Sequence, residues 1–99
     1  MSRTASPKVI WSNRTIGENI RTWRKLHHLT LDQVADRAGI ARSTLQRIEN
    51  GDGGVSIQAV LNVARALGIL DQMVQATDPY ETDFGRARAD YILPKRIRP

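Results

Sequence analysis

Nineteen residues in the middle of the chain, Leu31 to Glu49, leave few choices of fold. They have the pattern of two helices, Leu31–Ala38 and Arg42–Glu49, joined by Gly39 and a short turn. Two short helices that cross steeply need a small side chain where they meet, such as Ala35, and backbone freedom at the turn, which Gly39 provides. The apolar faces that would pack on neighbouring helices contain Val34, Ala38, Ile40, Leu45 and Ile48. Together these features predict a helix-turn-helix.

Capping patterns mark where two of the helices should begin. Thr15 with Glu18, and Thr30 with Gln33, match the arrangement in which a hydroxyl N-cap and a polar residue three positions later exchange hydrogen bonds. The first pair predicts a helix that starts after Thr15 and buries an apolar stripe. Residues 1–14 would then be an N-terminal arm, in which we expect Val9-Ile10-Trp11 to form a short strand.

The second half of the chain predicts two more helices and a tail. Ser56 and Gly68 bracket an apolar helix over about Ile57–Leu67. A short fifth helix would carry an apolar stripe too wide for one core, so part of it is expected at a dimer interface; its residues are Ile69, Leu70, Met73 and Val74. We therefore expect an all-α, five-helix domain over residues 15–76. A C-terminal tail over 77–99 would make dimer or partner contacts, with a short strand at Tyr91-Ile92-Leu93.

Composition argues against catalytic and metal chemistry. The absence of cysteine excludes disulfides, thiolate zinc sites, iron–sulfur clusters and cysteine nucleophiles. His27 and His28 are adjacent, and neighbouring residues on a helix do not face each other, so we assign them no metal or catalytic role. We expect no enzyme activity and no cofactor. With no apolar run long enough for a membrane span or a signal peptide, we expect a cytoplasmic protein.

The charge balance suggests a polyanionic partner. Fifteen Lys and Arg against ten Asp and Glu give a net charge of +5 at pH 7, which suits DNA or RNA, although a merely basic soluble protein has the same balance. The charges near the C-terminus are segregated. Residues 71–85 carry four acids and no base, whereas residues 86–99 carry five bases and one acid.

Residues 15–76 resemble the lambda-repressor-like, Cro/repressor-type (XRE) helix-turn-helix domain. The matching stretches include Ile16 to Arg21, Val34 to Ile40, Arg42 to Leu45, Arg47 to Gly51 and Val63 to Gly68. Two positions depart from the family pattern. Leu31 stands where a glutamine that contacts phosphate is usual, and Ala41 stands where a Ser or Thr usually caps the second helix of the motif. The missing cap costs about 1 kcal/mol.

The resemblance implies which residues face DNA. The helix Arg42–Glu49 would enter the major groove, where arginine reads guanine through two hydrogen bonds. The residues implied to contact bases or phosphates are Arg42, Ser43, Thr44, Gln46 and Arg47, with Gln33 as a weaker backbone contact. A solvated helix face is the alternative interpretation of the two arginines. The resemblance also implies a largely buried ion pair between Arg24 and Glu49.

The leading functional hypothesis is a sequence-specific DNA-binding repressor that acts as a homodimer on a palindromic operator. The acidic-then-basic tail resembles that of HipB-type antitoxins, which repress their own operon and bind a HipA-type kinase toxin. Two alternatives stay open. One is a free-standing phage or chromosomal repressor. The other is a protein–protein adaptor that does not bind DNA; it should lack positive groups on the second helix of the motif, where this chain has Arg42 and Arg47.

Overall fold

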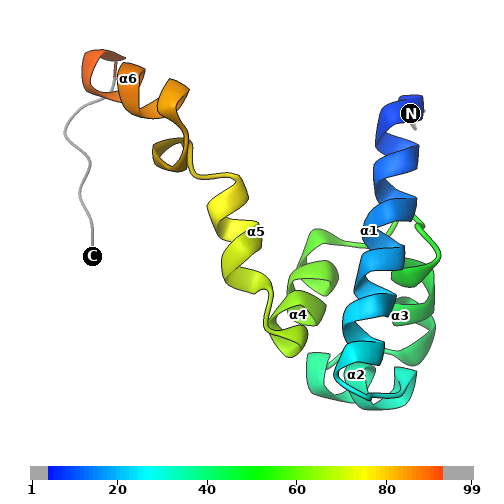
Figure 1. Cartoon of the computed structure of the whole chain (residues 1–99). Helices are drawn as coiled ribbons and strands as arrows, with labels where there is room; N and C mark the ends of the chain where they lie inside the picture. The colour runs from blue at the N-terminus through cyan, green and yellow to red at the C-terminus, as the bar shows by residue number, and fades with distance from the viewer. Residues whose placement is uncertain (1–4, 93–99) are drawn as a thin grey trace.

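The computed structural model describes residues 5–92, which form helices and contain no strand (Figure 1). The α-helices in this range are α1 (Pro7–Leu26), α2 (Leu31–Ala38), α3 (Arg42–Glu49), α4 (Ile57–Leu67), α5 (Leu70–Ala76) and α6 (Asp83–Ile92), with a 3-10 helix, η1 (Pro79–Glu81), before α6. The all-α expectation is confirmed. The bounds of α2, α3 and α4 are those expected from sequence.

Helix α1 begins much earlier than the Thr15–Glu18 pattern predicts. Its N-cap is Ser6, whose Oγ accepts a hydrogen bond from the Val9 N–H at 3.3 Å. Pro7 follows at the first helical position, where its missing N–H costs nothing. Thr15 therefore lies in the middle of α1. The expected strand at Val9-Ile10-Trp11 is wrong because the helix that starts at Pro7 includes these residues.

One core lies between α1, α2, α3 and α4. Helix α2 packs on α3 and α4, and α1 crosses α3 and α4. The largest fully buried side chains are Val34, Leu45, Val63 and Leu67. Ala35 and Ala38, each 3% exposed, allow α2 to lie close to its neighbours.

The caps around the helix-turn-helix follow the sequence closely. Thr30 and Gln33 form the expected capping box at the start of α2. Gly39 ends α2 in the left-handed conformation, with φ of 69°, which an L side chain rarely adopts. Ala41 makes no side-chain bond to the first turn of α3, as its sequence position implied. The turn is therefore sharp, and the N-terminus of α3 has no side-chain cap.

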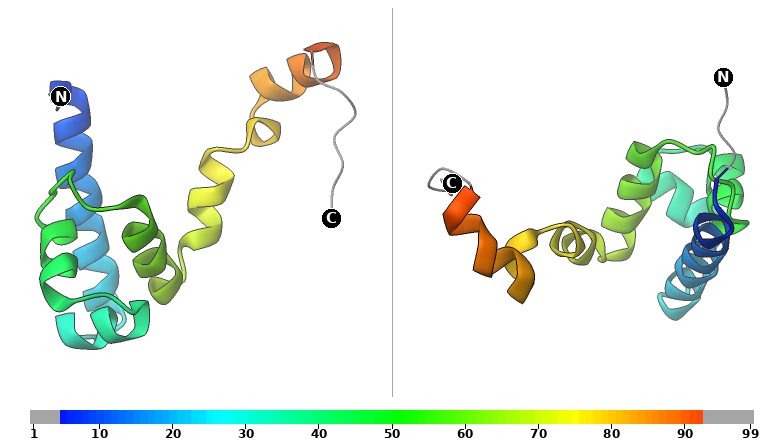
Figure 2. Two further views of the ribbon diagram at one scale, coloured as in Figure 1. Left: turned by 180° about the vertical axis from the view of Figure 1, so that it is seen from behind. Right: turned by 90° about the horizontal axis from the view of Figure 1, so that it is seen from above.

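Residues 70–92 form an arm that leads away from the four-helix unit (Figures 1 and 2). Helix α5 contacts α4, whereas α6 packs on η1. Thr82 starts α6 by accepting the Gly85 N–H at 2.9 Å, and Gly85 lies directly against the Pro79 carbonyl. Tyr91 and Ile92 are therefore helical, and the strand expected there is wrong; Leu93 lies outside the described residues.

Candidate nucleic-acid interface

Helix α3 has one buried face and one exposed face. Leu45, Ile48 and Glu49 are buried between α1, α2 and α4. The side chains on the other face are those expected to contact DNA: Arg42, Ser43, Gln46 and Arg47 are exposed, and Thr44 is half-buried. The turn from α2 and the packing of α1 fix the direction in which this face points.

Each exposed arginine on α3 has a carboxylate beside it. Arg42 Nη1 lies 3.4 Å from Asp32 Oδ2 in the first turn of α2. Arg47 Nε lies 2.7 Å from Asp52 Oδ2 in the loop after α3. These contacts orient the two arginine side chains. The side chains remain 55% and 52% exposed and so stay open to solvent.

Asp52 is itself held in place by the glycine loop. Its Oδ1 accepts the Gly54 N–H at 2.8 Å while its Oδ2 meets Arg47. The Arg47 guanidinium, with help from the Gly54 N–H, holds the pKa of Asp52 below its usual value. The same hydrogen bond to Asp52 raises the pKa of Arg47. Sequence reasoning missed this contact; an Asp two residues before a glycine, a common turn pattern, is the signal that could have indicated it.

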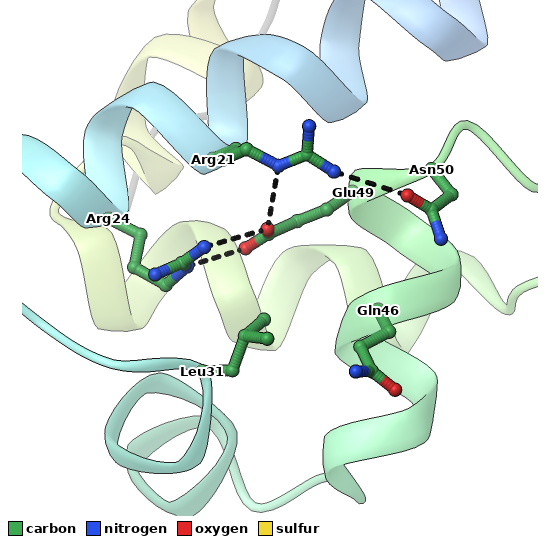
Figure 3. A pocket seen from close by; sticks show the side chains of 6 residues that line it. All are labelled: Arg21, Arg24, Leu31, Gln46, Glu49 and Asn50. Atoms are coloured by element: carbon green, nitrogen blue, oxygen red, sulfur yellow. Dashed lines mark hydrogen bonds and ion pairs between the residues drawn. The ribbon is translucent and has the colours of Figure 1, made fainter.

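Behind the exposed face, two arginines of α1 hold the C-terminal end of α3 (Figure 3). The Glu49 carboxylate, 3% exposed, accepts hydrogen bonds from Arg24 Nε at 2.8 Å, Arg24 Nη2 at 3.1 Å and Arg21 Nε at 3.2 Å. The bond to Glu49 raises the pKa of Arg24, although burial acts in the opposite direction. The buried ion pair expected between Arg24 and Glu49 is present. Arg21, one turn earlier on the same helix, was not foreseen.

The ion pairs of Arg21 and Arg24 with Glu49 border an open pocket of about 340 Å³ between α1, α2 and α3. Arg21 Nη2 donates to Asn50 Oδ1 at 3.1 Å and so ties α1 to the residue after α3. Leu31 forms an apolar wall of this pocket, and the Gln46 amide points away from Glu49 (Figure 3). The side chain of Leu31, which stands where the family usually has a glutamine, therefore cannot donate a hydrogen bond in this pocket. The uncharged polar side chains that line the pocket are Gln46 and Asn50.

Two further residues position the motif. Gln33 is exposed, and its Oε1 accepts the Thr30 N–H at 2.9 Å, so part of its amide serves the capping box. Gly17 lies where α1 touches the end of α3. A Cβ there would lie 2.5 Å from the Ile48 carbonyl oxygen and 2.6 Å from that of Glu49. The close approach of α1 to α3 thus requires glycine, a role that sequence reasoning did not assign.

The residues expected at a dimer interface lie at the base of the arm. Leu70, Met73 and Val74 are in α5, whereas Ile69 is its N-cap rather than part of the helix. None of the α5 side chains is buried, and Val74 is 60% exposed. Ile69, Leu70 and Met73 are half-buried, and Ile69 packs against the core of the four-helix unit.

His27 contacts residues of α1 and α4, and His28 is exposed. His27 Nε2 lies 3.1 Å from the Leu67 carbonyl oxygen at the end of α4, and its ring stacks on Trp23 with centroids 6.2 Å apart. Within residues 5–92, no three His, Asp or Glu side chains are grouped so as to hold a metal ion. No helix in the same range is long and apolar enough to cross a membrane.

Comparison with curated proteins gives relatives of two kinds. The chain is 33% identical to antitoxin PezA of Streptococcus pneumoniae over 73 residues, which is 67% of this chain and 46% of that protein. It is 32% identical to the HTH-type transcriptional repressor RghR of Bacillus subtilis over 80 residues, 69% of this chain and 59% of RghR. It is 36% identical to the immunity repressor protein of Bacillus phage phi105 over 77 residues, 78% of this chain and 51% of that repressor.

These matches cover about half the length of the curated relatives, from 46% to 59%. No solved structure matches the chain. The profile of the HTH_3 helix-turn-helix family matches residues 20–70, which contain α2, the turn at Gly39, α3 and α4. On the strength of this match and of the helix-turn-helix geometry, the chain belongs to the HTH_3 (XRE-type) helix-turn-helix family.

Proposed function

We propose that the chain is a sequence-specific DNA-binding transcriptional repressor that acts in the cytoplasm. One observation carries the proposal: Arg42 and Arg47 are both more than half exposed on the outward face of α3, while Arg21 and Arg24 fix the end of that helix from behind. A rigid helix with projecting guanidinium groups suits the major groove, where arginine bonds guanine at two atoms. Membership of the HTH_3 family and the names of two repressor relatives support it.

The other exposed residues of the motif would complete the contact with DNA. Ser43, Thr44 and Gln46 lie between the arginines along α3 and can reach base edges or phosphates. Gln33 would contact the phosphate backbone of the DNA through its amide nitrogen, since the capping box uses only the amide oxygen. On binding, Arg42 and Arg47 would exchange their ion pairs with Asp32 and Asp52 for contacts with DNA. Such an exchange is feasible because ion pairs between exposed groups contribute little stability.

We propose that two copies bind together on a palindromic operator. The dimer would form through the apolar surface at the base of the arm, which consists of Ile69, Leu70, Met73 and Val74. A two-fold dimer presents two copies of α3, and these read half-sites about 34 Å apart.

An antitoxin role is the second candidate, and the name of the relative antitoxin PezA favours it. The toxin that we propose is a HipA-type kinase, because the tail resembles that of HipB-type antitoxins. Arg86 and Arg88 are exposed on α6, where Arg86 pairs with Asp83 and Arg88 lies over the Phe84 ring, and both would meet an acidic partner surface. Lys95, Arg96 and Arg98 lie outside the described residues. Co-expression with the product of the neighbouring gene tests this role. A stable complex would support the antitoxin role, and separate elution would leave a free-standing repressor.

A gel shift with the DNA upstream of the chain's own gene tests the main proposal. A scrambled duplex of the same length is the control, and both are titrated at about 50 and 200 mM salt, since non-specific binding weakens strongly over this range. We expect a discrete complex on the upstream DNA that survives an excess of scrambled competitor. Equal, salt-sensitive binding to both duplexes, or no binding, would favour the adaptor hypothesis.

A further inference from the structure

The arm has an apolar face that nothing in the chain's own core covers. Helix α6 buries Gly85 and Ala89 against η1. Phe84 and Tyr91 are 68% and 88% exposed, and the Arg88 guanidinium between them lies over the Phe84 ring, 3.9 Å from its centre. The two aromatic residues are seven residues apart, so they lie on one face of α6, about 10.5 Å from each other along the helix axis.

An apolar groove lies between the four-helix unit and the base of the arm. It measures about 250 Å³ and is lined by Ile16, Asn19, Ile20, Trp23, Val60, Ala64, Ile69 and Met73 from α1, α4 and the start of the arm. Ile16 and Trp23 are 48% and 40% exposed along its α1 side. They too are seven residues apart, which again gives about 10.5 Å along the helix.

Within one chain the arm does not close over this groove. The radius of gyration is 16.4 Å, against about 13 Å for a compact domain of this length. Figure 2 shows α6 held away from α1 by the connection through α5 and η1. That connection is braced locally, because Asp78 Oδ1 accepts the Tyr80 N–H at 2.9 Å and Arg86 Nη1 donates to the Tyr80 carbonyl at 2.7 Å.

We propose that α6 of one copy lies in the α1–α4–α5 groove of a second copy, with the exchange repeated across a two-fold axis. Phe84 and Tyr91 would fill the groove beside Ile16 and Trp23. The occupant is a second copy because the groove is continuous with the surface proposed for the homodimer: Ile69 and Met73 belong to both, and α5 leads through η1 to α6. In a two-fold dimer both copies therefore gain the same contact. The inference rests on the proposed homodimer but not on DNA binding.

Sedimentation velocity of the full chain gives the first test. The variant Phe84→Ser with Tyr91→Ser removes the apolar face of α6 and leaves the four-helix core intact. We expect its dimer dissociation constant to rise at least tenfold. Asp90→Ser, at an exposed site on the same helix, is the matched control and should leave dimerisation unchanged. An unchanged dissociation constant in the double variant would overturn the proposal.

Cross-linking identifies the occupant, and the chain contains no cysteine of its own. Asn19 lies about midway between Ile16 and Trp23 on α1, and Arg88 lies about midway between Phe84 and Tyr91 on α6. In the proposed dimer Asn19 of one copy would therefore lie close to Arg88 of the other, whether α1 and α6 run parallel or antiparallel. Differently tagged chains carrying Asn19→Cys or Arg88→Cys are mixed with a short bismaleimide. We expect a mixed cross-linked dimer in much higher yield than with Gln58→Cys, an exposed site on α4, in place of Asn19→Cys.

The remaining outcomes separate this inference from the proposed function. A chain carrying both Asn19→Cys and Arg88→Cys that cross-links within itself at high dilution would show that the arm folds back, which overturns a second copy as the occupant. A dimer in sedimentation that gives no cross-link above the Gln58→Cys control would overturn the inference and leave the homodimer standing. A monomer at all concentrations would contradict both, whereas the DNA-binding part of the proposed function is decided separately by the gel shift.

Discussion

Arg47 faces the proposed DNA site while bound to a carboxylate of its own chain. Asp52 holds it at 2.7 Å, and the loop holds Asp52 through the Gly54 N–H. This arrangement limits the conformations of a long side chain before DNA arrives. In the proposed complex, the Asp52 carboxylate would lie beside the DNA major groove and repel it. A base that cannot replace this carboxylate as the partner of Arg47 would then be bound more weakly.

The Arg47–Asp52 pair predicts a pH dependence. Because the pKa of Asp52 is lowered in the folded chain, its contribution to stability is present above the pKa of the unfolded state and is lost as pH falls through the folded value. In an NMR titration of the carboxyl groups, Arg47→Ala should move the pKa of Asp52 upward, and only part of the way because the Gly54 N–H remains. The same midpoint in both proteins would show that Arg47 does not bind Asp52 in solution.

At Gly17 we expect alanine to change the free energy of unfolding in the direction opposite to the usual one. Replacing glycine by alanine inside a helix normally stabilises a protein by up to about 1 kcal/mol. Here the added methyl group would lie 2.5 Å from a backbone carbonyl of α3, which cannot easily move. We expect Gly17→Ala to lower the free energy of unfolding by about 1–3 kcal/mol in urea denaturation. A stabilised variant would mean that α1 does not approach α3 so closely.

The joint between α1 and α3 depends on a buried charge pair. Glu49→Gln leaves the Arg24 guanidinium buried without its carboxylate and should cost about 3–5 kcal/mol. Arg24→Met should cost less than this, because Arg21 Nε still donates to Glu49 at 3.2 Å. The double variant should lose clearly less than the sum of the two in the same thermal or urea experiment. Arg21→Met, which changes a side chain that is 40% exposed, should cost less. Additive losses for Arg24 and Glu49 would show that the two residues do not interact.

Sequence predicted those helices whose ends carry local signals. The Thr30–Gln33 box, Gly39 and Gly68 fix α2 and α4 through backbone bonds within a few residues. Ser6-Pro7 is an equally local signal for α1, but the composition of Val9-Ile10-Trp11 after it favours a strand. Val9, Ile10 and Trp11 are all exposed, so the Ser6 cap and continuity with the rest of α1, rather than burial, account for their helical conformation.

The candidate site was predictable only in part, for a related reason. Which residues of α3 face outward follows from helical spacing, and Arg42 and Arg47 lie on that face. The contacts of Arg21 and Arg24 with Glu49 join residues 28 and 25 positions apart, and only the resemblance to a known family indicated the contact of Arg24. The contact between Arg47 and Asp52 depends on the path of a glycine loop, which spacing alone does not specify.

At the scale of the whole molecule, we propose that the four-helix unit binds DNA and that the arm mediates dimerisation. A chain that ends at Ala76 keeps the whole core but loses η1 and α6. We expect it to melt cooperatively and to dimerise at least tenfold more weakly in light scattering, because it keeps the apolar surface at Ile69 to Val74 but lacks α6. It should also bind the operator at least tenfold more weakly than the full chain. A truncated chain that stays dimeric with full operator affinity would show that the arm takes no part in either.

The most direct measurement is fluorescence anisotropy of the operator and of a scrambled duplex with single arginine variants. Arg42→Ala and Arg47→Ala should each lose about 1–3 kcal/mol on the operator, or about 5- to 150-fold in affinity, with little change on scrambled DNA. Arg65→Ala, an exposed arginine on α4 outside the motif, should behave like the unmodified chain. If both α3 variants bind the operator as tightly as the unmodified chain, α3 does not read DNA and the central claim is wrong.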